Sequence, residues 1–207
     1  NGARCAALHA AQRRLQATSS KLQAKKIEIE TKAGIIEAEI KKVTSHQSPV
    51  TSQKIKVKMP QPKNFKADIP LKIGNKTILV NFVEVGVPHS VIFVENLEKI
   101  DVQNLGKEIR CHQKFQPQGT NVNFVKVVDK NNFQIRTYER GVEKETLSCG
   151  TGSTASAIIA YRKSLIAENE VNVHTQGEVL KVYFEKQLKN VYLEGEAKIV
   201  YEGKYEI

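Results

Sequence analysis

The residues best suited to chemistry lie close together in the second half of the chain. Glu139 and Arg140 form a charged pair, and Cys149 follows them directly before a glycine-rich turn at 150–152 and a run of small residues typical of a helix. The start of such a helix presents unpaired N–H groups and the positive end of its dipole, so it binds a carboxylate or phosphate and lowers the pKa of a nearby thiol. Cys149 is therefore predicted to be a reactive thiol.

Cys149 also has a structural interpretation, because cysteine is often buried and inert. The charged pair favours the reactive one. An arginine suits bidentate recognition of a carboxylate, and a glutamate can act as a base or bind an ammonium group. Together with the helix terminus, Glu139 and Arg140 favour a site for a zwitterionic amino acid.

The composition is that of a globular protein with excess positive charge. The 207 residues suffice for one large domain or two small ones. Lys+Arg 32 against Asp+Glu 22 gives a formal net charge of +10, and no apolar run is long enough for a membrane helix. Few aromatic residues lie among the lysines, which favours a solvated surface over a nucleic-acid site. We expect neither a nucleic-acid nor a membrane partner.

Three cysteines, Cys5, Cys111 and Cys149, lack the spacing of a zinc site or a disulfide framework. Their odd number, without a secretory signal, favours a reducing compartment, and we expect the cytoplasm. The sequence begins with Asn1 rather than methionine. We therefore expect that residues before Asn1 are missing from it.

Periodicity predicts the elements that must position these residues. Alternating apolar and charged side chains predict a β-hairpin over Lys26–Ile40. The same rule predicts strands over 77–85, 90–94, 123–129 and 132–139, and three or four more between 170 and 203. Helices are predicted over 3–15, 102–111 and 151–163. Residues 41–68 read as a connector with one strand and a domain boundary near 44–50. The fold class is α+β.

Two further features concern the ends of these elements. His89 follows Gly-Val-Pro at a strand corner, where a lone histidine more often has a structural role than a functional one. Residues 1–10 also align with residues 151–160, with Gly2 on Gly152, so each stretch is a glycine turn that opens a small-residue helix. This repeat predicts two similarly built halves with two helix N-termini directed at one ligand.

Five motifs now define a resemblance. N-G-A-R-C at 1–5, G-V-P-H at 86–89, G-T-N-V-N-F at 119–124, E-R-G at 139–141 and C-G-T-G at 149–152 resemble, in order and spacing, the motifs of diaminopimelate epimerases. The resemblance covers essentially the whole chain. It implies a pyridoxal-independent enzyme that interconverts LL- and meso-diaminopimelate, on the route to lysine and peptidoglycan, without metal or cofactor and as a homodimer.

The resemblance also implies the architecture. The family fold has two pseudo-symmetric halves, each a barrel of strands around a central helix, with the site between them. Residues 1–46, joined by a last strand at about 196–207, would be the truncated N-terminal half. Residues 47–195 would be the C-terminal half.

The site residues follow from the matching motifs. The family uses two cysteines on opposite faces of the substrate Cα, one as thiolate and one as thiol, because inversion by proton transfer needs a base and an acid on opposite sides. Cys149 matches one of these cysteines, Glu139 the acid that assists it, and His89 the histidine paired with the other cysteine. The matched substrate-binding residues are Asn1, Gly2, Asn121, Glu139, Arg140, Gly150 and Thr151. Asn121 and Arg140 would hold the distal end of the substrate.

The sequence departs from the family pattern at two places. The other catalytic cysteine would stand two residues before Asn1, outside this sequence, and Cys5 is the second cysteine of that motif, expected to face the helix interior. Val87 stands where many members have an asparagine that touches substrate. The loss of that amide puts one substrate contact in doubt.

Two alternatives remain open. A proline racemase-like isomerase would share the fold, but a proline-sized substrate would not need Arg140. A non-catalytic basic binding module is the other alternative, and it would be supported if the upstream cysteine were truly absent from the protein.

Overall fold

The computed structural model describes residues 2–18, 26–31, 34–41 and 52–200. Asn1, the predicted domain boundary near 44–50 and the end of the last predicted strand lie outside these ranges. The chain divides into two compact units, one comprising Asn1–Lys58 with Glu194–Ile207 and the other Met59–Leu193. The boundary after Lys58 lies later in the chain than the one predicted after residue 46, and the boundary after Leu193 lies slightly earlier than the one predicted after residue 195.

The smaller unit is a helix packed on a short sheet. Its elements are α1 (Gly2–Thr18), β1 (Lys26–Thr31), β2 (Gly34–Lys41), β3 (Ser52–Lys58) and the end of β12 (Val191–Lys198). The strands are ordered β1-β2-β3-β12. β1 and β2 pair antiparallel, as predicted for the hairpin, with Thr31 opposite Gly34, and the turn between them lies outside the described residues.

Helix α1 packs one of its faces on the sheet of the smaller unit. Ala7, Leu8 and Ala11 are buried against aliphatic side chains of the sheet, and Cys5 is exposed. The expectation that Cys5 faces the helix interior is wrong, because the helical spacing that aligns Leu8 and Ala11 on the sheet turns Cys5 away from it.

The larger unit is built on one curved sheet. Its strands are β4 (Lys63–Ile73), β5 (Lys76–Val85), β6 (Val87–Phe93), β7 (Asn121–Val127), β8 (Asn132–Glu139), β9 (Lys144–Thr146), β10 (Glu170–His174) and β11 (Val179–Phe184). The order is β12-β11-β10-β8-β7-β6-β5-β4, with β9 beside β8. Two short 3-10 helices, η1 (Leu97–Lys99) and η2 (Gln113–Phe115), flank α2 (Val102–Cys111).

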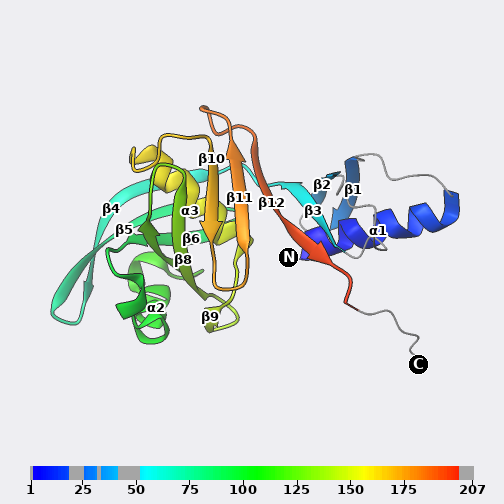
Figure 1. Cartoon of the computed structure of the whole chain (residues 1–207). Helices are drawn as coiled ribbons and strands as arrows, with labels where there is room; N and C mark the ends of the chain where they lie inside the picture. Colours follow the sequence, from blue (N-terminus) through cyan, green and yellow to red (C-terminus); the bar gives the residue numbers. More distant parts are fainter. Residues whose placement is uncertain (1, 19–25, 32–33, 42–51, 201–207) are drawn as a thin grey trace, which may run out of the picture. The chain divides into compact units, whose positions relative to one another are not determined.

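Two parallel pairings in this sheet determine where the helices lie. β6 pairs parallel with β7, and β8 pairs parallel with β10. Parallel neighbours need a crossover connection, and here α2 joins β6 to β7 while α3 (Gly150–Arg162) joins β8 to β10. In Figure 1 the strands curve around α3, whereas α2 lies outside them.

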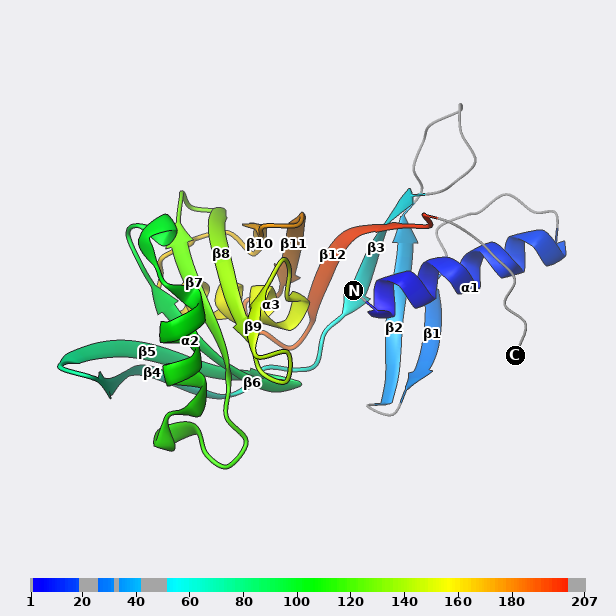
Figure 2. The same ribbon diagram turned by 90° about the horizontal axis from the view of Figure 1, so that it is seen from below.

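Strand alternation places α2 and α3 on opposite faces of the sheet. Val91, Val125 and Ile135 belong to the core around α3, whereas Phe124 and Tyr138 belong to the core beneath α2. Figure 2 shows both helices from below. Residues 152–160 of α3 are all buried, as expected for a helix covered on every side. The class is α+β, as the sequence predicts.

The connector at 41–68 contains more regular structure than the sequence predicts. β3 is the expected strand, but β4 begins at Lys63 and was not predicted. Its pairing with β5 shifts register twice, and Asn64 and Asp68 have positive φ angles. Because these bulges interrupt the alternation of apolar and polar residues along β4, the sequence pattern does not predict this strand. No described helix is long and apolar enough to cross a membrane.

Candidate active site

Three of the predicted site residues lie on neighbouring strands and face α3. His89 on β6 pairs with Asn121 on β7. Glu139 ends β8 and points to the same face as Thr137 and Ile135, because side chains two residues apart share a face. His89, Asn121 and Glu139 therefore lie on the face of the sheet that contacts α3, where β6 and β7 begin and β8 ends.

Arg140 is fixed to this edge by two hydrogen bonds. Its backbone N–H donates to Asn121 Oδ1 at 2.8 Å, and its Nη1 donates to the carbonyl oxygen of Gln118 at 2.8 Å. Asn121 Nδ2 in turn donates to the carbonyl oxygen of Pro88 at 3.4 Å. The carboxamide of Asn121 thus joins the segment before His89 to the start of the E-R-G motif.

Cys149 lies at the N-cap of α3, as the sequence predicts. The helix begins at Gly150, and the N–H of Ser153 donates to the Cys149 carbonyl oxygen at 2.9 Å. The Cys149 side chain is buried, and its Sγ lies 3.7 Å from Thr151 Oγ1. The first N–H groups of such a helix have no intrahelical acceptor, so those of Gly150 and Thr151 are suited to bind a carboxylate.

The pKa of Cys149 is raised, whereas the sequence analysis predicted that the helix terminus would lower it. Burial is the largest cause, since it disfavours the thiolate, and the negative charge of Glu139 adds to it. The Gly152 N–H and the Thr151 hydroxyl act in the opposite direction but are outweighed. The prediction was wrong because the helix start is a local feature, whereas burial depends on the whole sheet around it.

Glu139 is held from the side of β9. Thr146 Oγ1 donates to Glu139 Oε2 at 3.0 Å, and β9 pairs with β8 so that Glu139 lies opposite Lys144. The negative charge of Glu139 contributes to the raised pKa of Cys149. This short strand was not predicted, and it orients the carboxylate.

His89 is fully buried and neutral. The pKa of its imidazole is lowered to about 3, chiefly by burial and then by the positive charge of Arg140. Its Nδ1 lies 3.3 Å from Nδ2 of Asn123 on β7. A buried polar ring needs such a partner, so Asn123 belongs to the site as well.

The other predicted residues are distributed as follows. Gly2 begins α1 in the smaller unit, Asn1 lies outside the described residues, and Val87 is half-buried at the start of β6. Sequence reasoning missed Asn123, Thr137 and Thr146. For Asn123 and Thr137 the detectable signal was a polar side chain at an inward position among apolar ones, whereas the polar strand β9 gives no such signal for Thr146.

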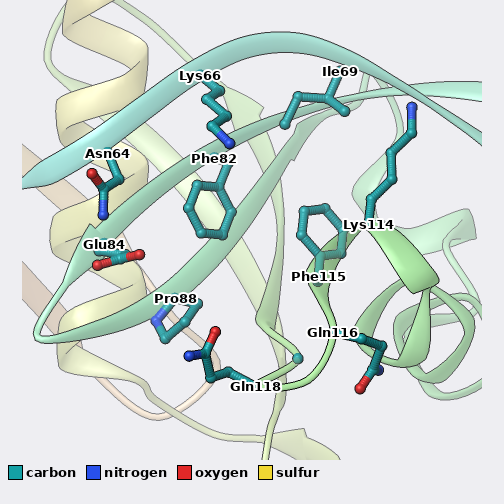
Figure 3. Close-up of a pocket in the computed structure, with 11 residues that line it drawn as sticks. Asn64, Lys66, Ile69, Phe82, Glu84, Pro88, Lys114, Phe115, Gln116 and Gln118 are labelled. Carbon is teal, nitrogen blue, oxygen red and sulfur yellow. The ribbon is translucent and has the colours of Figure 1, made fainter.

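A cavity of about 650 Å³ lies beside the core beneath α2, and His89 is not among its lining residues (Figure 3). Phe82 and Phe115 stack in its wall with ring centroids 5.8 Å apart; Phe115 belongs to the core beneath α2, and Phe82 packs against that core. Lys66 and Lys114 also line it. The cavity contains none of the predicted catalytic side chains. Among the described residues no three His, Cys, Asp or Glu side chains gather as a metal site would require.

Solved structures with the same fold include racemases and epimerases of small amino acids. A probable proline racemase from Agrobacterium radiobacter K84 matches with a TM-score of 0.68 and 12% identity, over 97% of this chain and 67% of that one. A hydroxyproline epimerase from Agrobacterium vitis matches with a TM-score of 0.66 and 14% identity, over 93% and 64%. This chain thus has the fold that these two proteins share.

Sequence similarity identifies the family within this fold. The profile of the diaminopimelate epimerase family matches residues 81–200. The diaminopimelate epimerase of Aquifex aeolicus (strain VF5) is 42% identical over 99% of this chain and 68% of its own length, and that of Hydrogenobaculum sp. (strain Y04AAS1) is 43% identical over 100% and 70%. The chain belongs to the diaminopimelate epimerase family, a family of isomerases.

Proposed function

We propose that this protein interconverts LL- and meso-diaminopimelate by cofactor-independent proton transfer at Cα, in the biosynthesis of lysine and peptidoglycan precursors. One observation carries the proposal. A buried thiol, Cys149, stands at a helix N-terminus beside the carboxylate Glu139, in a chain that is 42% identical to a diaminopimelate epimerase. This combination supplies an acid–base group and an anion site at one place.

The substrate would be held at both of its ends. The N–H groups of Gly150 and Thr151 bind the carboxylate at the reacting carbon and stabilise the charge that spreads onto it when the proton leaves. Arg140 binds the distal carboxylate, and Asn121 holds the Arg140 backbone in place. Asn1 and Gly2 would supply the corresponding donors at the start of α1.

Cys149 and Glu139 would perform one half of the proton transfer. The raised pKa keeps Cys149 as a thiol near neutral pH. As an acid, the thiol gives its proton to the Cα carbanion, forming a C–H bond and leaving a thiolate. In the reverse direction Glu139 first takes the thiol proton, and the thiolate then removes the Cα proton while the electron pair of that bond stays on carbon.

The other half of the transfer needs a second group on the opposite side of Cα. The family resemblance puts this group, a cysteine, two residues before Asn1 and assigns His89 as its partner. No metal or cofactor enters these steps.

The test is deuterium incorporation from heavy water into LL-diaminopimelate, followed by mass spectrometry with the full natural protein. We expect deuterium at one Cα and meso product. Cys149→Ser should lower this turnover at least about a hundredfold, because a hydroxyl is a poor acid–base group near neutral pH. Cys111→Ser, which changes an exposed free cysteine, is the matched control and should retain activity.

Two outcomes would contradict the proposal. Full turnover of Cys149→Ser would remove this residue from the reaction. Absence of exchange with a protein whose intact mass includes the upstream cysteine would exclude diaminopimelate as the substrate.

We also propose that the protein works on this small molecule as a cytoplasmic homodimer, without nucleic-acid or membrane partners. The support is the family resemblance and the scarcity of aromatic residues among the lysines. Sedimentation of the purified protein tests the dimer. Salt-sensitive DNA binding would instead favour a basic binding module.

A further inference from the structure

A chain of buried polar side chains crosses three neighbouring strands of the larger unit. His89 on β6, Asn123 on β7 and Thr137 on β8 are at most 3% exposed and face α3 together with Val91, Val125 and Ile135. Burying polar groups among aliphatic side chains costs free energy unless each finds a hydrogen-bond partner. The pattern of partners therefore restricts where the protons lie.

The orientation of the Asn123 carboxamide follows from its partners. Its Nδ2 lies 3.0 Å from the carbonyl oxygen of Ser90, which can only accept, so the NH₂ group must point there. Its Oδ1 accepts from Thr137 Oγ1 at 3.1 Å on the other side. A flipped carboxamide would set two oxygens against each other at Ser90.

This orientation decides the tautomer of His89. The same Nδ2 lies 3.3 Å from His89 Nδ1, and an NH₂ group donates only, so Nδ1 must accept and cannot carry a proton. The proton of the neutral ring is then on Nε2. This atom is completely buried and has no hydrogen-bond partner among the described residues. A donor that is buried and unpartnered in the resting protein is poised for an acceptor that arrives with the reaction.

We propose that Asn123 is a positioning residue that holds His89 as its Nε2–H tautomer, so that His89 donates a hydrogen bond from Nε2 to an anionic atom at the reacting centre. The identity of that acceptor rests on the proposed function, but the tautomer does not. A neutral donor stabilises an anion without giving up its proton, so His89 serves as an oriented donor rather than as a base. Its inability to become charged near neutral pH agrees with this role.

The direct test is nitrogen NMR of the full protein labelled with ¹⁵N-histidine, since protonated and unprotonated ring nitrogens have well-separated shifts. The chain contains five histidines, and the spectrum of His89→Gln identifies the His89 signals by their loss. We expect a protonated Nε2 and an unprotonated Nδ1 at pH 7. A proton on Nδ1, or on both nitrogens, overturns the proposal.

Asn123→Asp tests the cause of the tautomer. A carboxylate cannot donate to Nδ1, so we expect the proton of His89 to move to Nδ1 or the ring to become an imidazolium. Asn81→Asp is the matched control, because Asn81 is also buried in this sheet and donates to the carbonyl oxygen of Val91. An unchanged His89 signal in a folded Asn123→Asp variant would contradict the proposal.

Asn123→Ala keeps the test decisive if the aspartate variant does not fold. Loss of the donor should leave His89 as a mixture of both neutral tautomers, and wild-type shifts in this variant would again contradict the proposal. In the active enzyme we expect kcat of Asn123→Ala to fall about a hundredfold with KM little changed. The NMR measurement does not depend on turnover. An inactive protein in which His89 is the Nε2–H tautomer would therefore contradict the proposed function but not the proposal about the tautomer.

Discussion

At the residue scale, Gly152 shows how closely helix α3 approaches the buried polar side chains of His89, Asn123 and Thr137. A Cβ at this position would collide with Asn123 Oδ1 and lie 3.3 Å from Cys149 Sγ. Gly152 has no positive φ angle, so space and not backbone conformation requires glycine here. The second glycine of C-G-T-G therefore lets Cys149 and the partner of His89 lie side by side.

Gly152→Ala should displace the Asn123 carboxamide and lower both stability and activity. We expect a loss of about 1–3 kcal/mol in the free energy of unfolding, as overpacking of a core usually gives, and a clear fall in kcat. Urea unfolding and turnover measure the two effects. Gly106→Ala is the control, because its Cβ would press on Tyr138 at 2.6 Å in the core beneath α2. Equal loss of kcat in both variants would show that general strain, not Asn123, is responsible.

His89 predicts a pH dependence of stability. Its pKa is 6.5 in the unfolded chain and about 3 in the folded protein, chiefly because of burial and then because of Arg140. Between these values the unfolded chain binds more protons, so stability falls as pH falls, by roughly 1.4 kcal/mol per pH unit. Above pH 6.5 the histidine adds no slope.

The measurement is the free energy of unfolding of wild type and His89→Gln between pH 7.5 and about 3.5, in urea. Other groups titrate in both proteins, so the difference between the curves isolates His89. Wild type should lose stability faster below pH 6.5. Parallel curves would mean that His89 is not held neutral in the folded state.

At the element scale, Arg136 joins β8 to β9 and to η1. Its Nε and Nη2 donate to the two carboxylate oxygens of Glu145 at 2.7 and 2.8 Å, and its Nη1 donates to the carbonyl oxygens of Leu97 and Ile100 at 3.1 Å. β9 also carries Thr146, which holds Glu139. The position of the Glu139 carboxylate thus depends on this arginine.

Arg136→Lys should cost about 2 kcal/mol in the free energy of unfolding. An ammonium group cannot reproduce the planar fork, so part of the carboxylate and the two carbonyls lose their donors. The Arg136 and Glu145 side chains are only 18% and 21% exposed, so solvent compensates little. Lys181→Ala, which breaks the more exposed pair with Glu170, should cost less than about 0.5 kcal/mol. Equal costs in urea unfolding would contradict this account.

The elements differ in how well the sequence predicts them. The hairpin at β1–β2 and helix α3 were predictable, because alternation and the glycine turn are local signals. β4 was not, since its bulges break the alternation, and β9 is too short to show any. Glu139 and Cys149 lie within one motif, but Asn123 meets His89, 34 residues earlier in the sequence, through the parallel pairing of β6 with β7. Only the folded register shows that contact.

At the scale of the whole molecule, the larger unit contains its own hydrophobic cores. Both hydrophobic cores of the larger unit consist only of residues between Met59 and Leu193. The Met59 N–H donates to the Val191 carbonyl oxygen at 2.8 Å, so the two ends of this unit lie side by side. A segment with its own core and adjacent ends has the anatomy of an independent domain.

We therefore expect the fragment Met59–Leu193 to fold alone, with a cooperative thermal transition by circular dichroism and a dispersed NMR spectrum. A shorter fragment that ends at Leu165 should not fold, because it removes Val171, Val173, Leu180 and Val182 from the core around α3. Every described hydrogen-bond partner of the His89 ring lies within the longer fragment, so its Nε2–H tautomer should persist there. A fragment without a cooperative transition would show that the larger unit depends on the rest of the chain. A folded fragment with the other tautomer would show that residues outside Met59–Leu193, and not Asn123 alone, fix the proton of His89.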